Sequence, residues 1–123
     1  YNNPANTFVA NFLGTTNVIE GEIKDLIFTS KKGLIIKNIN KNAKGDSILL
    51  RPQNLYLESK NEKFEKFVGN VKSQEFLGNI VRYIVNIKDH LLILDTLHEA
   101  DKKIYSSNEE ITFYLDAEKI KFL

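Results

Sequence analysis

The sequence predicts an all-β fold, a small barrel or sandwich of two related β units with one short α-helix at the start of the chain. Short segments rich in β-branched and large apolar residues recur along the chain, and polar turn sequences separate them. Parts of the first half also reappear in the second half. The 123 residues are 42% hydrophobic, which suits one domain with a packed core.

The short helix is expected over residues 1–14. Asn3 can cap its first free N–H groups, and Pro4 stands where a missing N–H costs nothing. Gly14 supplies the left-handed residue with which many helices end. A single apolar stripe follows from the spacing of Phe8, Val9, Phe12 and Leu13. Because so short a helix is unstable alone in water, we expect this stripe to pack against a larger partner.

Short strands are expected over most of the remaining chain. The turn sequences Lys31-Lys32-Gly33 and 40–46 separate the first strands, and Gly78-Asn79 predicts a tight turn between two later ones. Residues 58–66 form a polar run that is expected to be a solvated segment between strands. Residues 97–108 are expected to be either a loop or one helical turn. The expected strands cover 18–28, 34–38, 48–51, 55–57, 67–77, 79–87, 91–94, 111–115 and 120–123.

A weak internal repeat supports the division into two units. Gly21-Glu-Ile-Lys24 resembles Gly69-Asn-Val-Lys72. Further along, the ten residues 48–57 resemble the ten residues 113–122, each reading as a strand, a polar corner and a second strand. Units of this size are too small to close a core alone, so we expect the two to pack together.

The composition argues against several classes of function. With 17 basic and 16 acidic residues the net charge is +1, so no strong attraction to nucleic acid or anionic lipid is expected. Arg51 and Arg82 are the only arginines, and the absence of cysteine excludes disulfides and thiolate chemistry. No run approaches the roughly 18 apolar residues of a membrane span. Because the chain lacks methionine and starts at Tyr1, we expect a domain cut from a longer soluble polypeptide.

No catalytic or metal-binding group can be assembled from the sequence. The two histidines have carboxylates near them, but their spacing repeats no known ligand pattern. Paired carboxylates in the last third of the chain flank turns, where solvated surface is expected rather than the desolvated pocket that acid–base catalysis needs. The residues considered are His90, His98, Asp89, Asp95, Glu99, Glu109, Glu110, Asp116 and Glu118.

Most aromatic side chains are expected in the core. Stacking platforms for nucleic-acid bases normally accompany a basic groove, which the balanced charge does not support. Burial of each ring would instead stabilise the fold by roughly 1.5–3 kcal/mol. The aromatic residues assigned in this way are Phe8, Phe12, Phe28, Phe64, Phe67, Phe76, Tyr83, Tyr105, Phe113, Tyr114 and Phe122.

Three segments, in order, resemble a known family. Residues 4–14 with Asn17 look like the segment after the nucleotide-binding domain of ABC importer ATPases of the maltose, spermidine and ferric-iron type. Residues 50–55, Leu-Arg-Pro-Gln-Asn-Leu, resemble that family's Arg-Pro-Glu corner, with Gln53 where a carboxylate is usual. Residues 69–83, through Gly69-Asn-Val, Glu75-Phe-Leu-Gly78 and Val81-Arg-Tyr83, resemble its second glycine-led strand pair, whereas 95–108 follow no family pattern.

The resemblance implies a transport-associated OB (TOBE) domain. Residues 1–16 would then be a connecting helix from an ATPase domain, and 17–123 an OB-like accessory domain. The chain lacks the Gly-x-x-x-x-Gly-Lys-Ser/Thr loop, so we expect no enzyme activity and no cofactor in it, whereas the parent chain would use ATP and Mg²⁺. Interdomain contacts are expected at Phe8, Phe12, Gly14, Asn17, Arg51, Pro52 and Arg82.

The implied role is regulation and dimer contact in ATP-driven solute uptake. The expected partners are the nucleotide-binding domain of the same chain, a second ATPase subunit in a homodimer and, indirectly, the membrane subunits. The location would be cytoplasmic, peripheral on the inner face of the membrane, with no nucleic acid bound. These motifs are shared by importers of different solutes and do not specify the transported substrate.

Alternatives remain open at this stage. Arg51 either contacts another domain or braces its own corner, and the second interpretation is favoured. Arg82 either lines an anion-binding cleft or lies on a solvated sheet face, and again the second is favoured. A different class of function is a free-standing sensor that holds an oxyanion, a sugar or a polyamine between the two β units. A third is single-stranded nucleic-acid binding.

Overall fold

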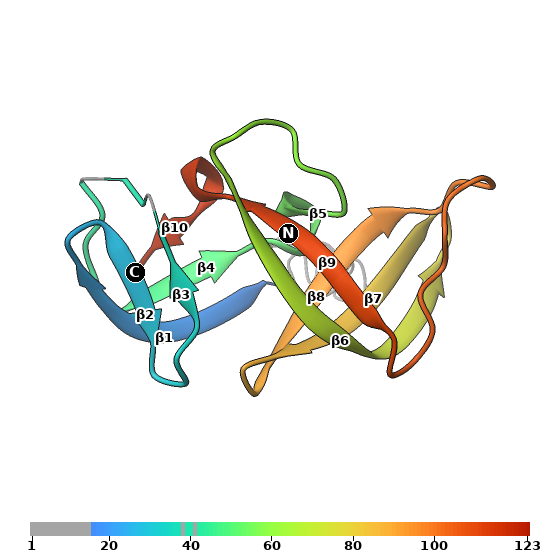
Figure 1. Ribbon diagram of the computed structural model, residues 1–123, viewed down its shortest axis with the longest axis horizontal. Helices are drawn as coiled ribbons and strands as arrows, with labels where there is room; N and C mark the ends of the chain where they lie inside the picture. The colour runs from blue at the N-terminus through green and yellow to red at the C-terminus, as the bar shows by residue number, and fades with distance from the viewer. Residues whose placement is uncertain (1–15, 38, 41) are drawn as a thin grey trace, which may run out of the picture.

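The computed structural model describes residues 16–37, 39–40 and 42–123. Over these residues the chain forms ten strands in two five-stranded sheets that lie side by side (Figure 1). All neighbouring strands run antiparallel, which confirms the all-β prediction. In spatial order the first sheet holds β10 (Lys121–Phe122), β4 (Ser47–Leu50), β1 (Asn17–Lys24), β2 (Ile27–Ser30) and β3 (Ile35–Ile36). The second holds β5 (Leu55–Tyr56), β9 (Glu110–Asp116), β6 (Phe64–Leu77), β7 (Ile80–Ile87) and β8 (His90–Leu97).

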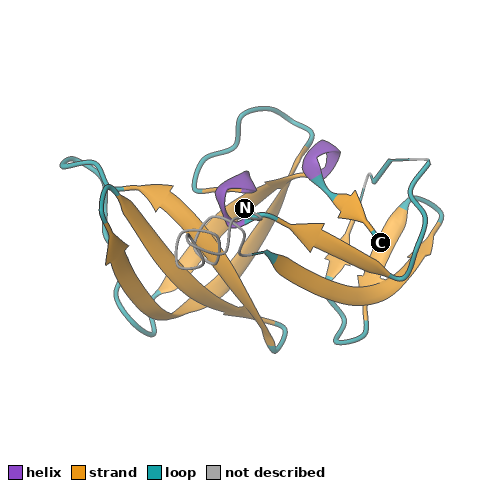
Figure 2. Cartoon of the chain, turned by 180° about the vertical axis from the view of Figure 1, so that it is seen from behind, coloured by secondary structure: helices purple, strands orange, loops and turns teal. Residues whose placement is uncertain are grey.

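The predicted internal repeat is confirmed by the strand connections. From β4 the chain passes through the 3₁₀ helix η2 (Pro52–Asn54) into β5 of the other sheet. From β9 it returns through η3 (Ala117–Lys119) into β10 of the first sheet. Both 3₁₀ helices lie where the two sheets meet (Figure 2). Each half of the chain therefore completes the sheet of the other half with its own last strand.

The register of the exchanged strands is also equivalent. Tyr56 of β5 pairs with Tyr114 of β9. The residues at the same places in the repeat, Lys121 and Leu49, pair with each other in the first sheet. The sequence similarity between 48–57 and 113–122 thus reflects one supersecondary unit used twice.

The glycines that begin the two related segments share a physical role. A Cβ atom on Gly21 would lie 2.7 Å from the Phe28 ring, and one on Gly69 would lie 2.7 Å from the carbonyl oxygen of Asn86. Real side chains do not approach so closely, so only glycine lets the neighbouring strand pack at these points.

Two tight hairpins depart from the predicted strand pattern. The single strand expected over 18–28 is the hairpin of β1 and β2, because Asp25 and Leu26 both adopt left-handed φ angles of 54° and 64°. The strand expected over 91–94 is longer and follows a similar turn at Lys88 and Asp89, with φ angles of 51° and 64°. Such two-residue turns usually carry glycine or asparagine, and neither turn contains them.

Other boundaries differ by a few residues. β6 begins at Phe64, so it includes the last three residues of the stretch 58–66, which was expected to be a solvated polar segment. Its pairing with β7 shifts register between Val71 and Ser73, and this bulge bends the long strand so that the second sheet curls (Figure 1). Residues 98–109 form turns and loop without helix, so the loop alternative is the correct one there.

The core follows from alternation along the strands. In β7 buried and partly exposed residues alternate, and one face carries Val81, Tyr83, Val85 and Ile87 inward. Phe28 and Phe113 are also at most 1% exposed, as predicted. Phe76 contradicts the prediction with 53% exposure, because it lies near the tip of the β6–β7 hairpin where the sheet extends beyond the core.

Candidate functional site

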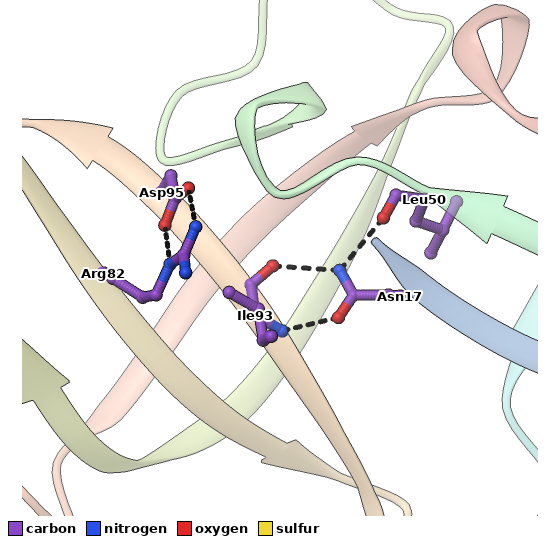
Figure 3. A network of polar contacts seen from close by, with 5 residues as sticks. All are labelled: Asn17, Leu50, Arg82, Ile93 and Asp95. Carbon is purple, nitrogen blue, oxygen red and sulfur yellow. Dashed lines mark hydrogen bonds and ion pairs between the residues drawn. The ribbon is translucent and has the colours of Figure 1, made fainter. Parts of the chain in front are cut away.

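A buried asparagine joins the two sheets at their junction. Asn17 begins β1, and its side-chain Nδ2 donates hydrogen bonds to the carbonyl oxygens of Leu50 at 3.1 Å and Ile93 at 2.9 Å. The backbone N–H of Ile93 donates to Asn17 Oδ1 at 2.7 Å (Figure 3). Because β8 is an edge strand, the amide of Asn17 pairs with it as a further strand would. We call these three hydrogen bonds the amide clasp.

An ion pair lies beside the amide clasp on the same strand. Arg82 of β7 faces Asp95 of β8, with Nε–Oδ1 and Nη2–Oδ2 distances of 2.8 Å each (Figure 3). The two side chains are only 13% and 9% exposed. The hydrogen bonds to Asp95 raise the pKa of Arg82, against the opposing effect of burial. The favoured prediction of a solvated sheet face for Arg82 is therefore wrong, because its guanidinium forms a bidentate pair within the sheet.

The predicted corner at Arg51 and Pro52 is the crossing between the sheets. Pro52 is buried at the first position of η2, where its ring suits the tight turn. The carbonyl oxygen of Arg51 accepts a hydrogen bond from the N–H of Asn54 at 2.9 Å and closes that turn. The backbone of Arg51 thus shapes the corner, and an interdomain contact of its side chain stays a prediction.

Three of the predicted contact residues and the predicted helix belong to the first fifteen residues of the chain. Phe8, Phe12 and Gly14 lie outside the described residues, as does the whole predicted helix. The boundary expected between 16 and 17 also stays a prediction, although β1 begins at Asn17.

A cleft of about 520 Å³ lies next to Asp95, which forms part of its lining. One wall comes from η2, β5 and residues 57–60, and the other from the end of β8 and residues 99–104. Its apolar lining consists of Leu55, Tyr56, Leu57, Ile80, Leu97 and Ile104. Its size is in the range that holds a small organic ligand.

The charges around the cleft balance one another. Three lysines and three acidic residues line it, namely Lys60, Lys102, Lys103, Glu58, Asp95 and Glu99. Lys102 Nζ lies 3.2 Å from Glu58 Oε1, so an ion pair connects the two walls, and Glu58 raises the pKa of Lys102. Lys103 pairs with Glu109 and lies 4.8 Å from the ring centre of Tyr105. The cleft therefore offers no concentrated positive or negative charge.

A buried tyrosine holds the loop that forms the second wall. The hydroxyl of Tyr83 accepts a hydrogen bond from the backbone N–H of Tyr105 at 3.0 Å. The two rings meet edge to face, with centres 5.8 Å apart. Burial raises the pKa of Tyr83, and the Tyr105 N–H partly opposes this. Because Tyr83 is 1% exposed and belongs to the core, the loop is attached to a fully buried side chain.

Reasoning from the sequence missed this cleft. It left 95–108 without a family pattern, yet Leu97 and Ile104 of that stretch line the cleft. The available signal was the presence of these two aliphatic residues within a mostly polar run. Nothing in the sequence indicated that they would face Tyr56 and Leu57, because these lie some forty residues earlier in the chain.

The histidines do not form a metal centre in the described part of the chain, where no group of three potential ligands gathers. His98 is exposed, with its ring centre 5.4 Å from that of Phe76. His90 is partly buried and bonded to Ser30 of the other sheet. Across the residues that the structure describes, no helix has the length and apolar character that crossing a membrane requires.

Comparison with known proteins places this architecture in context. Residues 48–123 match the profile of the TOBE domain. The chain is 29% identical over 106 residues to the spermidine/putrescine import ATP-binding protein of Chromobacterium violaceum, covering 76% of this chain and 29% of that protein. It is 32% identical over 92 residues to the Fe(3+) ions import ATP-binding protein of Fusobacterium nucleatum, covering 72% and 24%. It is 28% identical over 116 residues to the spermidine/putrescine import ATP-binding protein of Onion yellows phytoplasma, covering 92% and 27%. The chain thus spans less than a third of the length of these relatives.

Proposed function

Because the chain belongs to the TOBE domain family, we propose that it serves as the accessory domain of the ATP-binding subunit of an ABC importer. The observation that supports this proposal is the family match over residues 48–123, together with import ATP-binding proteins among the relatives. ATP and Mg²⁺ would bind in the remainder of the parent chain, since the phosphate-binding loop sequence is absent here. The domain itself would carry no catalytic step.

The proposed role is to keep two ATP-binding subunits together. The exchanged strands and the amide clasp join both β units into one body, which suits a domain that must hold its shape while its neighbours move. If two such domains stay in contact when the ATPase domains open, reclosure is intramolecular and benefits from a high effective concentration. The partners would be the ATPase domain of the same chain, a second subunit and, indirectly, the membrane subunits on the cytoplasmic face.

Deletion of residues 17–123 from the parent subunit tests this role. We expect the purified, truncated subunit to hydrolyse ATP at high protein concentration and to lose activity on dilution more steeply than the intact subunit. Sedimentation should show the corresponding loss of dimer. An unchanged dilution profile and unchanged solute uptake in reconstituted vesicles would contradict the role. A parent gene without a phosphate-binding loop ahead of this domain would contradict the family role itself.

A second candidate function is favoured by the cleft, namely the binding of a small regulatory ligand. Its volume of about 520 Å³ and its apolar lining residues suit such a ligand. The balanced charges of the lining residues favour a neutral polyhydroxy compound such as a sugar, because an oxyanion or a polyamine would need a surplus of one charge. The ion pair of Glu58 and Lys102 would have to open, or to form part of the ligand contacts.

Calorimetric titration of the chain with maltodextrins, molybdate, sulfate and polyamines tests this candidate function. We expect heat with maltodextrins alone, and its loss in Leu97→Glu, which places a charge at the cleft. Leu91→Glu is the matched control, because Leu91 lies on the same strand with 63% exposure against 62% for Leu97 and does not line the cleft. No heat with any compound, or heat that Leu97→Glu leaves unchanged, would exclude the cleft as the binding site.

A further inference from the structure

A second hydrogen bond joins the two sheets at some distance from the amide clasp. Ser30 ends β2 and is 4% exposed, and its Oγ lies 2.8 Å from Nε2 of His90, which begins β8. Along β8, His90 precedes the Ile93 contact of the clasp by three residues, or about 10 Å at the usual rise of a strand. Two separate polar contacts therefore hold β8 against the first sheet.

The hydrogen bonds around Ser30 determine whether Ser30 Oγ or His90 Nε2 carries the proton of the hydrogen bond between them. Its Oγ accepts hydrogen bonds from the backbone N–H of Leu34 at 2.8 Å and of Lys32 at 3.2 Å. A hydroxyl has two acceptor lone pairs and one proton, so both lone pairs are in use. The remaining hydroxyl proton must go to His90 Nε2, which has to be the unprotonated nitrogen of a neutral imidazole.

We propose that Ser30 and His90 form a pH-sensitive latch between the two β units, closed with neutral imidazole and released when His90 is protonated. An imidazolium carries a proton on Nε2 as well as on Nδ1. That N–H would point at an oxygen whose lone pairs are occupied, and the hydroxyl proton would point back at it. Protonation therefore replaces an attractive contact with a repulsive one.

Burial of His90 and the charged groups that face it set the direction of the switch. Lys32 lies on the turn after β2, and its Nζ donates to the carbonyl oxygen of Asp89 at 2.9 Å. Burial and the Lys32 charge lower the pKa of His90 from its ordinary value, and the Asp89 carboxylate opposes them. Since the folded pKa lies below the unfolded one, the neutral latch contributes stability above pH 6.5, and this contribution is lost as the pH falls through the folded pKa.

The two contacts respond differently to acid. The amide of Asn17 does not titrate, so the clasp stays in place while the latch opens. Acidification would thus loosen the junction only at the Ser30 end and leave β8 attached through Ile93. The latch does not depend on the proposed transport role, and a test on the chain alone addresses it separately.

Nuclear magnetic resonance of the imidazole nitrogens is the direct test. The chain has two histidines, so His98→Gln leaves His90 as the single signal and serves as the matched control. We expect His90 Nε2 to be unprotonated at neutral pH and to titrate below pH 6.5. The backbone amide signals of Lys32 and Leu34, which donate to Ser30 Oγ, should shift with the same midpoint. In Ser30→Ala this coupling should disappear.

Hydrogen exchange supplies a second measurement. The protection factor of the Leu34 amide should fall severalfold across the His90 titration in the wild type and in His98→Gln. In His90→Gln, whose side-chain carbonyl accepts a hydrogen bond without titrating, it should not change with pH. Either of two results would overturn the latch. One is a proton on His90 Nε2 at neutral pH, and the other is Lys32 and Leu34 amide signals that do not shift during the His90 titration.

Discussion

Removal of the amide clasp is the sharpest test of how the two sheets are joined. Asn17→Ala deletes the three hydrogen bonds to Leu50 and Ile93 and leaves the strand backbone intact. Asn17 is 5% exposed, so the partners that it leaves behind are largely shielded from water. The substitution therefore removes the two hydrogen bonds between the sheets, both to Ile93, together with the one to Leu50 of the same sheet.

The expected cost can be worked out from these three bonds. Each contributes a net of about 1 kcal/mol, and a buried N–H or C=O left unpaired costs about 1–3 kcal/mol. If water reaches some of the freed groups, the total destabilisation is about 3 kcal/mol. For a domain of this size, that corresponds to a fall of about 10 °C in the melting temperature. It would be a large part of the roughly 5–15 kcal/mol by which such domains are stable.

Urea denaturation followed by circular dichroism measures the change. Asn70→Ala is the matched control, because Asn70 is an exposed asparagine within β6, and its cost should stay within about 0.5 kcal/mol. Asn17→Asp keeps the shape of the side chain and removes the donor to both carbonyl oxygens, so it should be at least as destabilising at neutral pH. An Asn17→Ala variant as stable as Asn70→Ala would refute the reasoning.

Three further predictions concern the second sheet. Asp95→Ala should cost about 2–3 kcal/mol in urea denaturation, because it leaves the largely buried charge of Arg82 without its bidentate partner. The double replacement of Arg82 and Asp95 by leucine should recover part of this loss. Gly69→Ala should cost more than about 2 kcal/mol in the same assay, because its Cβ would meet the backbone of β7. Tyr83→Phe should cost about 1 kcal/mol and accelerate hydrogen exchange of the Tyr105 amide, which loses its acceptor.

Each of these has a result that would contradict it. A double leucine variant less stable than Asp95→Ala would show that Arg82 gains little from its partner. A Gly69→Ala variant of unchanged stability would mean that β6 and β7 can separate locally without cost. Unchanged exchange at Tyr105 would mean that the loop of residues 98–109 is held by contacts other than the Tyr83 hydroxyl.

The strands could be predicted from the sequence because their alternation and composition are local. The repeat could also be predicted from the sequence, because residues 48–57 and 113–122 carry similar residue types at equivalent positions of a strand, a corner and a second strand. The turns at Asp25-Leu26 and Lys88-Asp89 could not be recognised, because they adopt left-handed angles without glycine or asparagine. The aspartate in each turn adopts the left-handed region more readily than most residues, whereas Leu26 and Lys88 adopt it against their local preference.

The site was harder to predict because its parts are distant in the sequence. The cleft combines residues 53–60 with 95–104, and no local pattern indicates that these segments meet. The ion pair is different. Once the two-residue turn at Lys88-Asp89 is known, Ile87 lies opposite His90, and counting back along both strands places Arg82 opposite Asp95. The expected strands left 88–90 as a connection of unspecified geometry, so the register that pairs Arg82 with Asp95 was not predicted.

The strand exchange explains why no domain boundary can be drawn between the two β units. The first sheet needs β10 from the end of the chain, and the second needs β5 from the end of the first half. A cut after β5 would strip an edge strand from each sheet and expose β4 and β9 to new pairing. The amide clasp and the latch then hold β8 across the same junction. The repeat has thus become one cooperative body, in which a change at the junction reaches both sheets.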